Sequence, residues 1–503
     1  MTTRTPIKAS KAALTTRRGV LRATSGILAA AAMSSLRPLA SAAQLKPDGT
    51  PEVAADITGQ LARYMVEAGR QTLPGPVLRE AKIHILDTLG AMISGARLKP
   101  GEMAIRYVRA QGGVSEASVF TTNLKTSAAN CALAHGMFAH ADETDDFEPV
   151  TKAHPGCSVV PAALAVAERE GRSGVDLLRG VTLGYDLGCR FLMALGPDLV
   201  RATHRSAEGM SATFGAAVAA ASLAGLDELG MQYALSYASQ QVSGIWSWVR
   251  DADHVEKAFD FGGMGARNGV TAALMVQAGF TGVRNVLDGE NNPLQALSTQ
   301  PKPAEIIAGL GSRFFVTETA IKRFPVGYPI QAPLDALLTL RKENNLTPDN
   351  VLQIVVRLPE DGASIVDNSA MPDVNCQHIM AVALVDGTVS FIEGNSRERM
   401  KDPRVLAVRQ RVKLIGDRQL MDPEAPRSGQ VEVTLKDGKT VSHFTKYPPG
   451  TKENPLDGAS MNEKVRDLMA PVLGADRTEA VIRQVNALEE LDNVRKLCGM
   501  LTA

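Results

Sequence analysis

The chain has 503 residues with 54 basic and 54 acidic side chains, and aromatic residues make up only 4% of it. This length exceeds what one ordinary hydrophobic core holds, so we expect two domains. The net charge of zero, with no basic stripe, zinc-ligand spacing or RNA-binding aromatic motif, excludes nucleic-acid binding as the main function.

Residues 1–43 have the organisation of an export signal. The pair Arg17 and Arg18 is followed by a weakly apolar run over residues 23–35 and by small residues at 40–42. This order is typical of a twin-arginine signal peptide cleaved near Ala42 or Ala43, with a disordered or amphipathic leader as the alternative. We therefore expect the precursor to engage the twin-arginine export machinery and the mature protein to be periplasmic. The apolar run is too short for a transmembrane helix, so we expect no stable membrane insertion after signal removal.

The five cysteines are scattered and contain no Cys-x-x-Cys pair. An odd number cannot all pair, and a protein exported in folded form does not need oxidation to fold. We expect each to be a small buried apolar residue rather than part of a disulfide framework. Cys157 lies three positions after His154, but no triad or oxyanion-hole pattern supports a nucleophilic role.

Residues 53–316 show apolar side chains at helical spacing, interrupted by glycine-containing breaks. Examples are ITGQLARYMVEAG from residue 57, PVLREAKIHILDTLGAMISG from residue 76 and SGVDLLRGVTLGYDLGCRFLMALG from residue 173. Amphipathic stretches of this length predict helices that pack closely through alanine and glycine. An all-helical core domain follows.

Composition changes after Phe315. The segments 351–359 and 429–447 carry β-branched residues in alternation, and Lys436–Lys439 has the composition of a tight hairpin turn. Residues 377–385 between them have a helical pattern. We predict an α+β domain over residues 317–447, after which residues 448–503 return to helical periodicity.

The stretch from His135 to Pro161 holds most of the reactive side chains, with three histidines and five carboxylates between two helical segments. These side chains are His135, His140, His154, Asp142, Glu143, Asp145, Asp146 and Glu148. A solvated acidic loop is one interpretation. A metal site is another, although His-x-His, His-Glu-x-x-His and EF-hand spacings are absent. An acid–base site is the third, because an imidazole and a carboxylate transfer protons near neutral pH.

This stretch resembles the first catalytic motif of the MmgE/PrpD family, in which an aspartate-rich loop leads into His-Pro and then a Pro-Ala helix. Further segments match the family in order and cover nearly the whole chain after residue 55. They are 209–226, 256–282, 321–337, 378–387 and 448–457. Members of this family include 2-methylcitrate dehydratase, cis-aconitate decarboxylase and iminodisuccinate epimerase.

The resemblance implies a mainly α fold in which the last helices rejoin the helical domain and the α+β part is an inserted lid. It also implies a homodimer and chemistry that needs neither a metal nor another cofactor. The substrates of such enzymes are small di- or tricarboxylates that lose water, carbon dioxide or a proton next to a carboxylate. Cations that hold carboxylates, plus a positioned acid or base, suit this chemistry.

The resemblance places catalysis on His154, in the His-Pro motif, with an aspartate orienting it. Asp142 aligns with the first aspartate of the family's Asp-x-Asp-Asp run if one extra residue is allowed. Asp145 is the alternative for the residue that faces the pocket, and it is also a candidate for substrate binding. Phe147 replaces a threonine that usually follows the double aspartate, which removes a hydroxyl donor.

The resemblance also assigns cations to the site. Lys257 aligns with a family lysine, again with one extra residue before Asn268, and is expected to act in catalysis. Lys322 aligns with the lysine at the start of the lid and, with Arg323 beside it, is expected to bind a substrate carboxylate. His378 stands where the family commonly has a tyrosine and is a further candidate for substrate binding.

His204 is the candidate for a second catalytic histidine. It precedes Thr213-Phe214-Gly215 by about two residues more than the family spacing, so an insertion is needed to align it. Without an insertion, Ser206 occupies this position and the pocket has lost a base.

These features favour a lyase, either a dehydratase or a decarboxylase, acting on a small polycarboxylate. An epimerase that removes and returns an α-proton with the same groups is the first alternative, because both reactions share the carbanion-forming step. A periplasmic carboxylate-binding protein without catalysis is the second.

Overall fold

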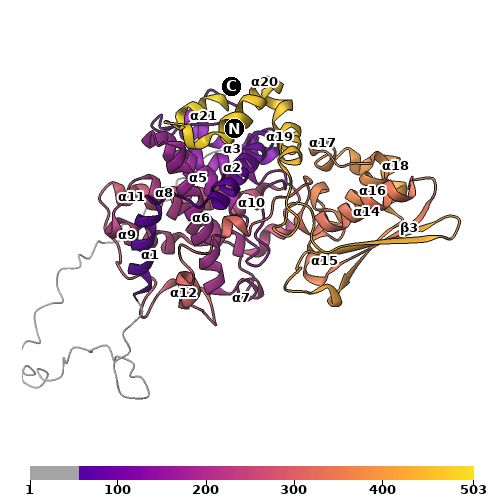
Figure 1. The fold of residues 1–503 in the computed structure, drawn as a ribbon, viewed down its shortest axis with the longest axis horizontal. Coiled ribbons are helices and arrows are strands. Elements are labelled where there is room, and N and C mark those ends of the chain that lie inside the picture. The colour runs from indigo at the N-terminus through magenta and orange to yellow at the C-terminus, as the bar shows by residue number, and fades with distance from the viewer. Residues whose placement is uncertain (1–55) are drawn as a thin grey trace, which may run out of the picture. The chain divides into compact units, whose positions relative to one another are not determined.

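The computed structural model describes residues 56–503, and the predicted signal peptide lies outside them (Figure 1). The predicted mainly α fold is confirmed: helices make up most of the described chain, and its one larger sheet has four strands. None of the helices in residues 56–503 is both long and apolar enough to cross a membrane.

Almost all of the regular secondary structure in residues 57–317 is helical. Their α-helices are α1 (Ile57–Ala68), α2 (Gly75–Gly95), α3 (Lys99–Gln111), α4 (Ala128–Ala139), α5 (Gly156–Glu170), α6 (Gly174–Leu195), α7 (Pro197–Ala202), α8 (Ala207–Leu223), α9 (Glu228–Gln241), α10 (Val255–Ala258), α11 (Met264–Gln277), α12 (Pro293–Leu297) and α13 (Ala304–Ile307). Shorter elements are the hairpin of β1 (Ala117–Ser118) and β2 (Lys125–Thr126), the 3₁₀ turns η1 (Trp246–Arg250) and η3 (Phe315–Thr317), and the π-helical turn η2 (Phe259–Gly263).

Helix α8 lies at the centre of this region because its sequence, AEGMSATFGAAVAAASL, is apolar on every face. It packs against α5, α6, α9 and α11. Local signals fix the ends of the surrounding helices. Ser173 and Asp176 form a capping box at the start of α6, and Gly196 with φ 78° ends it.

The packing is close enough in places to require glycine. A Cβ atom on Gly262, in η2, would lie 2.1 Å from the carbonyl oxygen of Gly136, in α4. Because carbon and oxygen cannot approach so closely, the two backbones touch only where both side chains are absent. This contact brings α4 and η2 together beside the residues described below.

Residues 324–445 have a core of their own. The elements are η4 (Tyr328–Ile330), α14 (Gln331–Asn344), β3 (Val351–Pro359), α15 (Glu360–Val366), η5 (Pro372–Val374), α16 (Cys376–Asp386), α17 (Phe391–Gly394), η6 (Arg399–Lys401), α18 (Pro403–Arg409), β4 (Val412–Asp417), η7 (Arg418–Leu420), β5 (Gly429–Leu435) and β6 (Thr440–Thr445). The sheet has the order β4-β3-β5-β6, with β4 parallel to β3 and the other pairs antiparallel. The predicted hairpin turn at Lys436–Lys439 is confirmed, and Gly438 takes φ 89° there.

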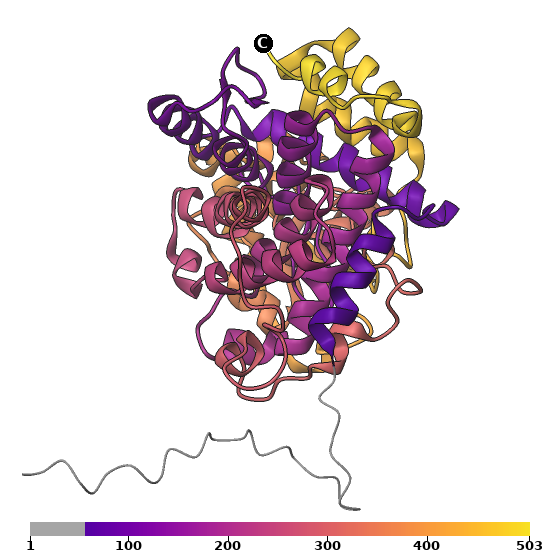
Figure 2. The same cartoon turned by 90° about the vertical axis from the view of Figure 1, so that its left-hand side faces the viewer.

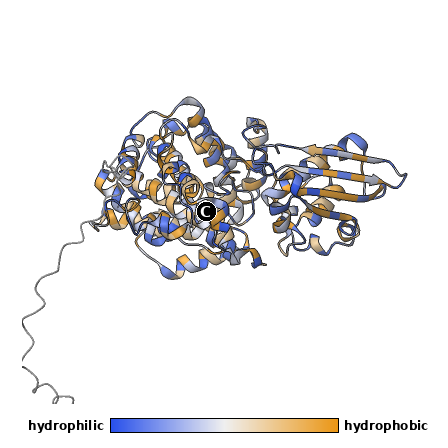
Figure 3. Cartoon of the chain, turned by 90° about the horizontal axis from the view of Figure 1, so that it is seen from below, coloured by the Kyte–Doolittle hydropathy of each residue, from blue (hydrophilic) through white to orange (hydrophobic). Residues whose placement is uncertain are grey.

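The last helices are α19 (Gly458–Leu473), α20 (Ala475–Asn486) and α21 (Arg495–Met500), with the 3₁₀ turn η8 (Leu488–Glu490) between the second and third. Helices α19 and α20 pack against α2, and α21 packs against α5. Apolar residues of all three helices therefore belong to the core of the first region. Figures 1 and 2 show these yellow helices beside the indigo ones. Figure 3 shows hydrophobic residues along the helices and the strands alike.

Candidate functional site

The acidic loop between α4 and α5 is held in place by Asp146. The carboxylate of Asp146 accepts a hydrogen bond from the backbone N–H of Gly156 at 2.9 Å, which satisfies the first turn of α5. It also contacts Nδ1 of His84 at 2.7 Å and the hydroxyl of Tyr185. Asp146 therefore fixes the loop and the start of α5, and the neighbouring side chains are positioned as a consequence.

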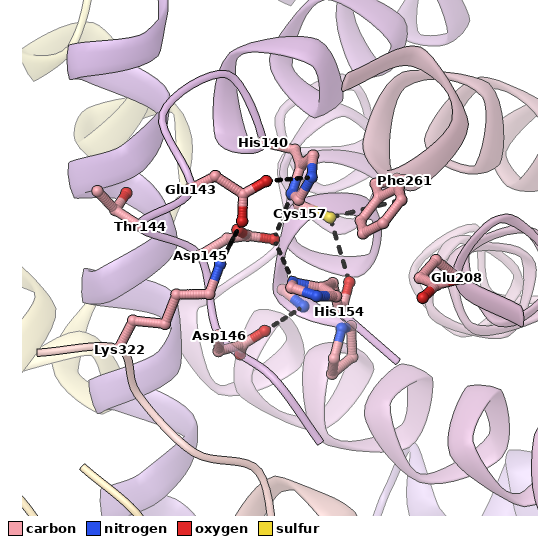
Figure 4. A network of polar contacts seen from close by, with 12 residues as sticks. His140, Glu143, Thr144, Asp145, Asp146, His154, Cys157, Glu208, Phe261 and Lys322 are labelled. Carbon is pink, nitrogen blue, oxygen red and sulfur yellow. Dashed lines mark hydrogen bonds and ion pairs between the residues drawn. The ribbon is translucent and has the colours of Figure 1, made fainter. Parts of the chain in front are cut away.

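Asp145 is the centre of a buried polar cluster (Figure 4). Its Oδ2 lies 2.8 Å from Nδ1 of His140 and 3.0 Å from Nδ1 of His154, and its Oδ1 accepts from Nζ of Lys322 at 3.1 Å. Burial opposes ionisation of Asp145, but these neighbours lower its pKa well below the usual range. The Asp145 carboxylate is therefore charged at neutral pH and holds two imidazoles.

Glu143 is the second acid of the cluster. It accepts from Nζ of Lys257 and, at 3.2 Å, from Nζ of Lys322. Its Oε1 also lies 3.5 Å from Nε2 of His140 and 3.4 Å from Nε2 of His254. Burial would raise the pKa of Glu143, but the two lysines lower it well below its ordinary value. Glu143 and His254 both take positive φ, 56° and 61°, a strained backbone that is common at functional sites.

His154 sits between aromatic rings at the start of α5. Its ring centroid lies 5.1 Å from that of Phe147 and 5.0 Å from that of Phe261. The side chain is 7% exposed, and within residues 56–503 its ring makes a hydrogen bond through Nδ1, to Asp145, and none through Nε2. Cys157 donates its thiol to the carbonyl of His154 at 3.2 Å, and burial raises the pKa of Cys157 well above its usual value. A thiol in that state is a poor nucleophile, and all five cysteines are buried and free, as predicted.

Asp142 makes no hydrogen bond or ion pair with His154. Its carboxylate accepts hydrogen bonds from the hydroxyls of Ser94, in α2, and Thr144. Burial raises the pKa of Asp142 to about 7, against the effect of these hydrogen bonds. Of the two aspartates proposed to orient His154, the structure pairs Asp145 with it.

The structure also distinguishes His204 from Ser206. His204 is exposed, with φ 60°, after the end of α7. Ser206 is fully buried at the N-cap of α8 and donates its hydroxyl to Asp260 of η2. Burial raises the pKa of Asp260 to about 8. His204 therefore lies outside the polar cluster. Ser206 and its hydrogen-bond partner Asp260 are both buried instead.

The remaining two candidates, Arg323 and His378, take no part in the hydrogen bonds and ion pairs of the polar cluster. Arg323 is exposed and lines a surface hollow with Thr144 and Lys464. His378 is fully buried on α16, where neither ring nitrogen has a hydrogen-bond partner, and burial lowers its pKa to about 4. No hydrogen bond or ion pair among residues 56–503 joins Arg323 or His378 to Asp145 or Glu143.

Two groups of side chains have atoms close enough to share one cation: His140, Glu143 and His254, and His140, Asp145 and His154. Both carboxylates already accept from lysine ammonium groups. A further positive charge that close is opposed by Coulomb repulsion. The lysines therefore make the cluster better suited to proton transfer than to metal binding.

Sequence reasoning missed Glu143, His140 and His254 as members of the cluster. Glu143-Thr144-Asp145-Asp146 keeps the Asp-x-Asp-Asp spacing with glutamate first and needs no extra residue, and this signal could have identified Glu143. The extra residue predicted between Lys257 and Asn268 coincides with η2, whose wider π-helical turn takes up more residues than an α-helical turn.

Comparison with known proteins agrees with these motifs. Residues 59–306 match the MmgE/PrpD N-terminal domain, and residues 324–490 match the MmgE/PrpD C-terminal domain. A cis-aconitate decarboxylase of Homo sapiens is 26% identical over 445 residues, covering 85% of this chain and 89% of its own. The cis-aconitate decarboxylase-like protein oryM of Aspergillus oryzae is 24% identical over 485 residues (90% and 98%), and a cis-aconitate decarboxylase of Aspergillus terreus is 23% identical over 478 residues (88% and 96%).

Proposed function

Because the chain belongs to the MmgE/PrpD family, we propose that it is a cofactor-independent lyase that breaks a bond next to a carboxylate of a small di- or tricarboxylate. The family and the cis-aconitate decarboxylases among its relatives support a lyase-type reaction on a carboxylate. The polar cluster supports the finer proposal, in which His154 transfers the proton and Asp145 orients it.

The single observation that carries this proposal is the pair of His154 and Asp145, 3.0 Å apart and buried. A charged carboxylate at Nδ1 keeps the Nδ1 proton in place and stabilises the imidazolium that forms when Nε2 takes a second proton. Nε2 is left as the atom that exchanges protons with substrate. Burial between Phe147 and Phe261 limits the access of water to that exchange.

A decarboxylation and a dehydration place similar demands on this pair. In decarboxylation the bond to the departing carboxylate breaks, its electron pair moves onto the neighbouring carbon, and the His154 imidazolium donates a proton there. In dehydration an α-proton leaves to a base and the departing hydroxyl receives a proton. Each reaction requires a proton to be transferred at a fixed atom. Each also develops negative charge nearby, which cations such as Lys257 and Lys322 would stabilise.

The test is a turnover assay of the purified chain with cis-aconitate and then with other di- and tricarboxylates. In deuterated water, a decarboxylation product should gain one deuteron at the carbon that lost the carboxylate. His154→Ala should lower kcat at least about 100-fold, since general acid–base groups contribute on that order. His204→Ala is the matched control and should retain the rate, because His204 is exposed. Full activity of the His154→Ala variant, or no turnover on any polycarboxylate, would overturn the proposal.

A further inference from the structure

Helix α2 anchors the acidic loop through polar side chains on one of its faces. Ser94 donates its hydroxyl to Asp142, and Nδ1 of His84 lies 2.7 Å from the carboxylate of Asp146. His84, Asp87 and Ser94 all belong to α2, and their spacing places them on the same side of the helix. Asp87, which lies between the other two, reaches the loop through a lysine of another helix.

That lysine is Lys464 of α19, whose side chain is only 7% exposed. Its Nζ donates to the carboxylate of Asp87 and, at 2.8 Å, to the backbone carbonyl of Thr144. Thr144 also donates its own hydroxyl to Asp142 at 2.7 Å. The side chain and the carbonyl of Thr144 are therefore both fixed by hydrogen bonds.

Thr144 lies between the two acids of the polar cluster, Glu143 and Asp145. The carbonyl that Lys464 binds belongs to the peptide group between Thr144 and Asp145, so this bond fixes the backbone from which the Asp145 side chain extends. Asp145 in turn lies 3.0 Å from Nδ1 of His154. On the other side, Glu143 takes φ 56°, a strained conformation that persists only where the surrounding structure supports it. Lys464 supplies such support from outside the loop.

The charge of Lys464 is balanced by α2 and not by the cluster. Burial raises the pKa of Asp87 to about 6, although Lys464 acts to lower it. Asp87 is therefore mostly ionised at neutral pH and remains paired with Lys464. Within residues 56–503, no hydrogen bond or ion pair joins Lys464 to Glu143 or Asp145. Lys464 can thus hold the backbone of the loop without competing for the acids that engage the cluster lysines.

We propose that Lys464 is a positioning residue for the proton transfer, because it holds the peptide between Thr144 and Asp145 so that the Asp145 carboxylate meets Nδ1 of His154. This inference rests on the proposed function and adds to it a residue that acts through Asp145. It also gives a role to the return of the last helices to the first region. Helix α19 packs against α2 and brings an ammonium group to a residue 320 positions earlier in the chain.

The first test observes the hydrogen bond between His154 and Asp145 in the full chain, without substrate. In proton magnetic resonance spectra of protein with isotope-labelled histidine, the Nδ1–H of His154 should give a low-field signal that the His154→Ala variant lacks. Lys464→Met should shift or remove this signal, because the Asp145 backbone is no longer held. An unchanged signal in Lys464→Met would overturn the proposal.

Lys82 offers a matched control. It lies on α2 and pairs with Glu489 of η8 at 2.9 Å, so it also joins α2 to the C-terminal segment. In the described part of the chain, Lys82 makes no hydrogen bond or ion pair to the acidic loop. Lys82→Met should therefore keep the His154 signal, and an equal change in both lysine variants would show a general loss of structure instead of positioning.

The second test is the rate of turnover. Lys464→Met should lower kcat about 10- to 100-fold, since a small displacement of a catalytic group costs that much, and Lys82→Met should keep the rate. Because Lys464→Met leaves the Asp87 carboxylate buried without its partner, it is also combined with Asp87→Asn, which leaves no unpaired charge. This double variant should fold and show the same losses, and a folded double variant with the natural signal and rate contradicts the proposal. If the natural chain turns over no polycarboxylate, the lyase proposal fails, and the His154 signal still decides the role of Lys464.

Discussion

The structure assigns opposite roles to two neighbouring aspartates, and substituting each by asparagine tests this. Asp142 is buried against Ser94 and Thr144 with its pKa raised to about 7, whereas Asp145 is held ionised by His140, His154 and Lys322. In Asp142→Asn, a neutral amide of the same shape replaces a carboxyl group that resists ionisation. We expect the variant to be more stable than the natural chain at pH 8 and to keep its activity.

The magnitude follows from the pKa difference between the folded and unfolded chain. An aspartate in an unfolded chain has a pKa near 3.9, so the native state retains the Asp142 proton through a range in which the unfolded state has lost it. The unfolded state then binds fewer protons, and the free energy of unfolding falls as pH rises from about 4 to about 7. Three pKa units correspond to about 4 kcal/mol, which is the upper limit of the gain that Asp142→Asn shows above pH 7.

Urea denaturation at pH 5 and pH 8 measures this effect. The stability gained by Asp142→Asn should be smaller at pH 5 than at pH 8 by up to about 3 kcal/mol. The reason is that most of the range between the unfolded-state and folded-state pKa values of Asp142 lies above pH 5. Asp145→Asn should do the reverse and lose about 3–5 kcal/mol at pH 8, since it leaves Lys322 with one partner fewer. Asp145→Asn should also lose activity, because His154 then lacks the charged carboxylate that orients it. A pH-independent effect of Asp142→Asn would refute the reasoning, as would lost turnover in that variant.

Two further predictions concern packing and export. Gly262→Ala should destabilise the fold by about 1–3 kcal/mol or more in thermal unfolding, because its Cβ would meet the Gly136 carbonyl oxygen. Gly458→Ala is the control, because a Cβ there meets no atom within 4 Å. Equal destabilisation by the two substitutions would contradict the packing argument. Replacing both Arg17 and Arg18 by lysine should retain the precursor in the cytoplasm, whereas the natural chain should appear in the periplasm beginning near Ala43 or Gln44; a doubly substituted protein found in the periplasm would contradict the signal-peptide prediction.

Much of the secondary structure could be predicted because its determinants are local. The alternation of β-branched residues predicted β3, β5 and β6, and Asp437-Gly438 predicted the turn between the last two. Strand β4 was not predicted. It pairs in parallel with β3 at residues more than fifty positions away, and its short sequence VKLIGD carries little alternation.

The site could be predicted in part, because His154 and Asp145 lie nine residues apart in one loop. The choice between Asp142 and Asp145 depended on which side of the loop each carboxylate faces. Between the two aspartates the backbone takes a positive φ at Glu143, which no sequence pattern indicates. His254 was missed for a different reason: it reaches Glu143 only because α10 packs against α4, more than a hundred residues earlier in the chain.

The pairing of the lysines bears on whether this site catalyses or only binds. Carboxylate binding alone favours cations that are free of protein anions, yet Lys257 and Lys322 are both engaged by Glu143 and Asp145. The two acids and two lysines balance in charge, and burial lowers the pKa of His140 to about 3, so that this imidazole is neutral. The internal pairs keep Asp145 ionised against His154 before any ligand arrives, which is the preorganisation that a proton-transfer site needs and a simple binding site does not. We therefore favour catalysis over binding alone in this cluster.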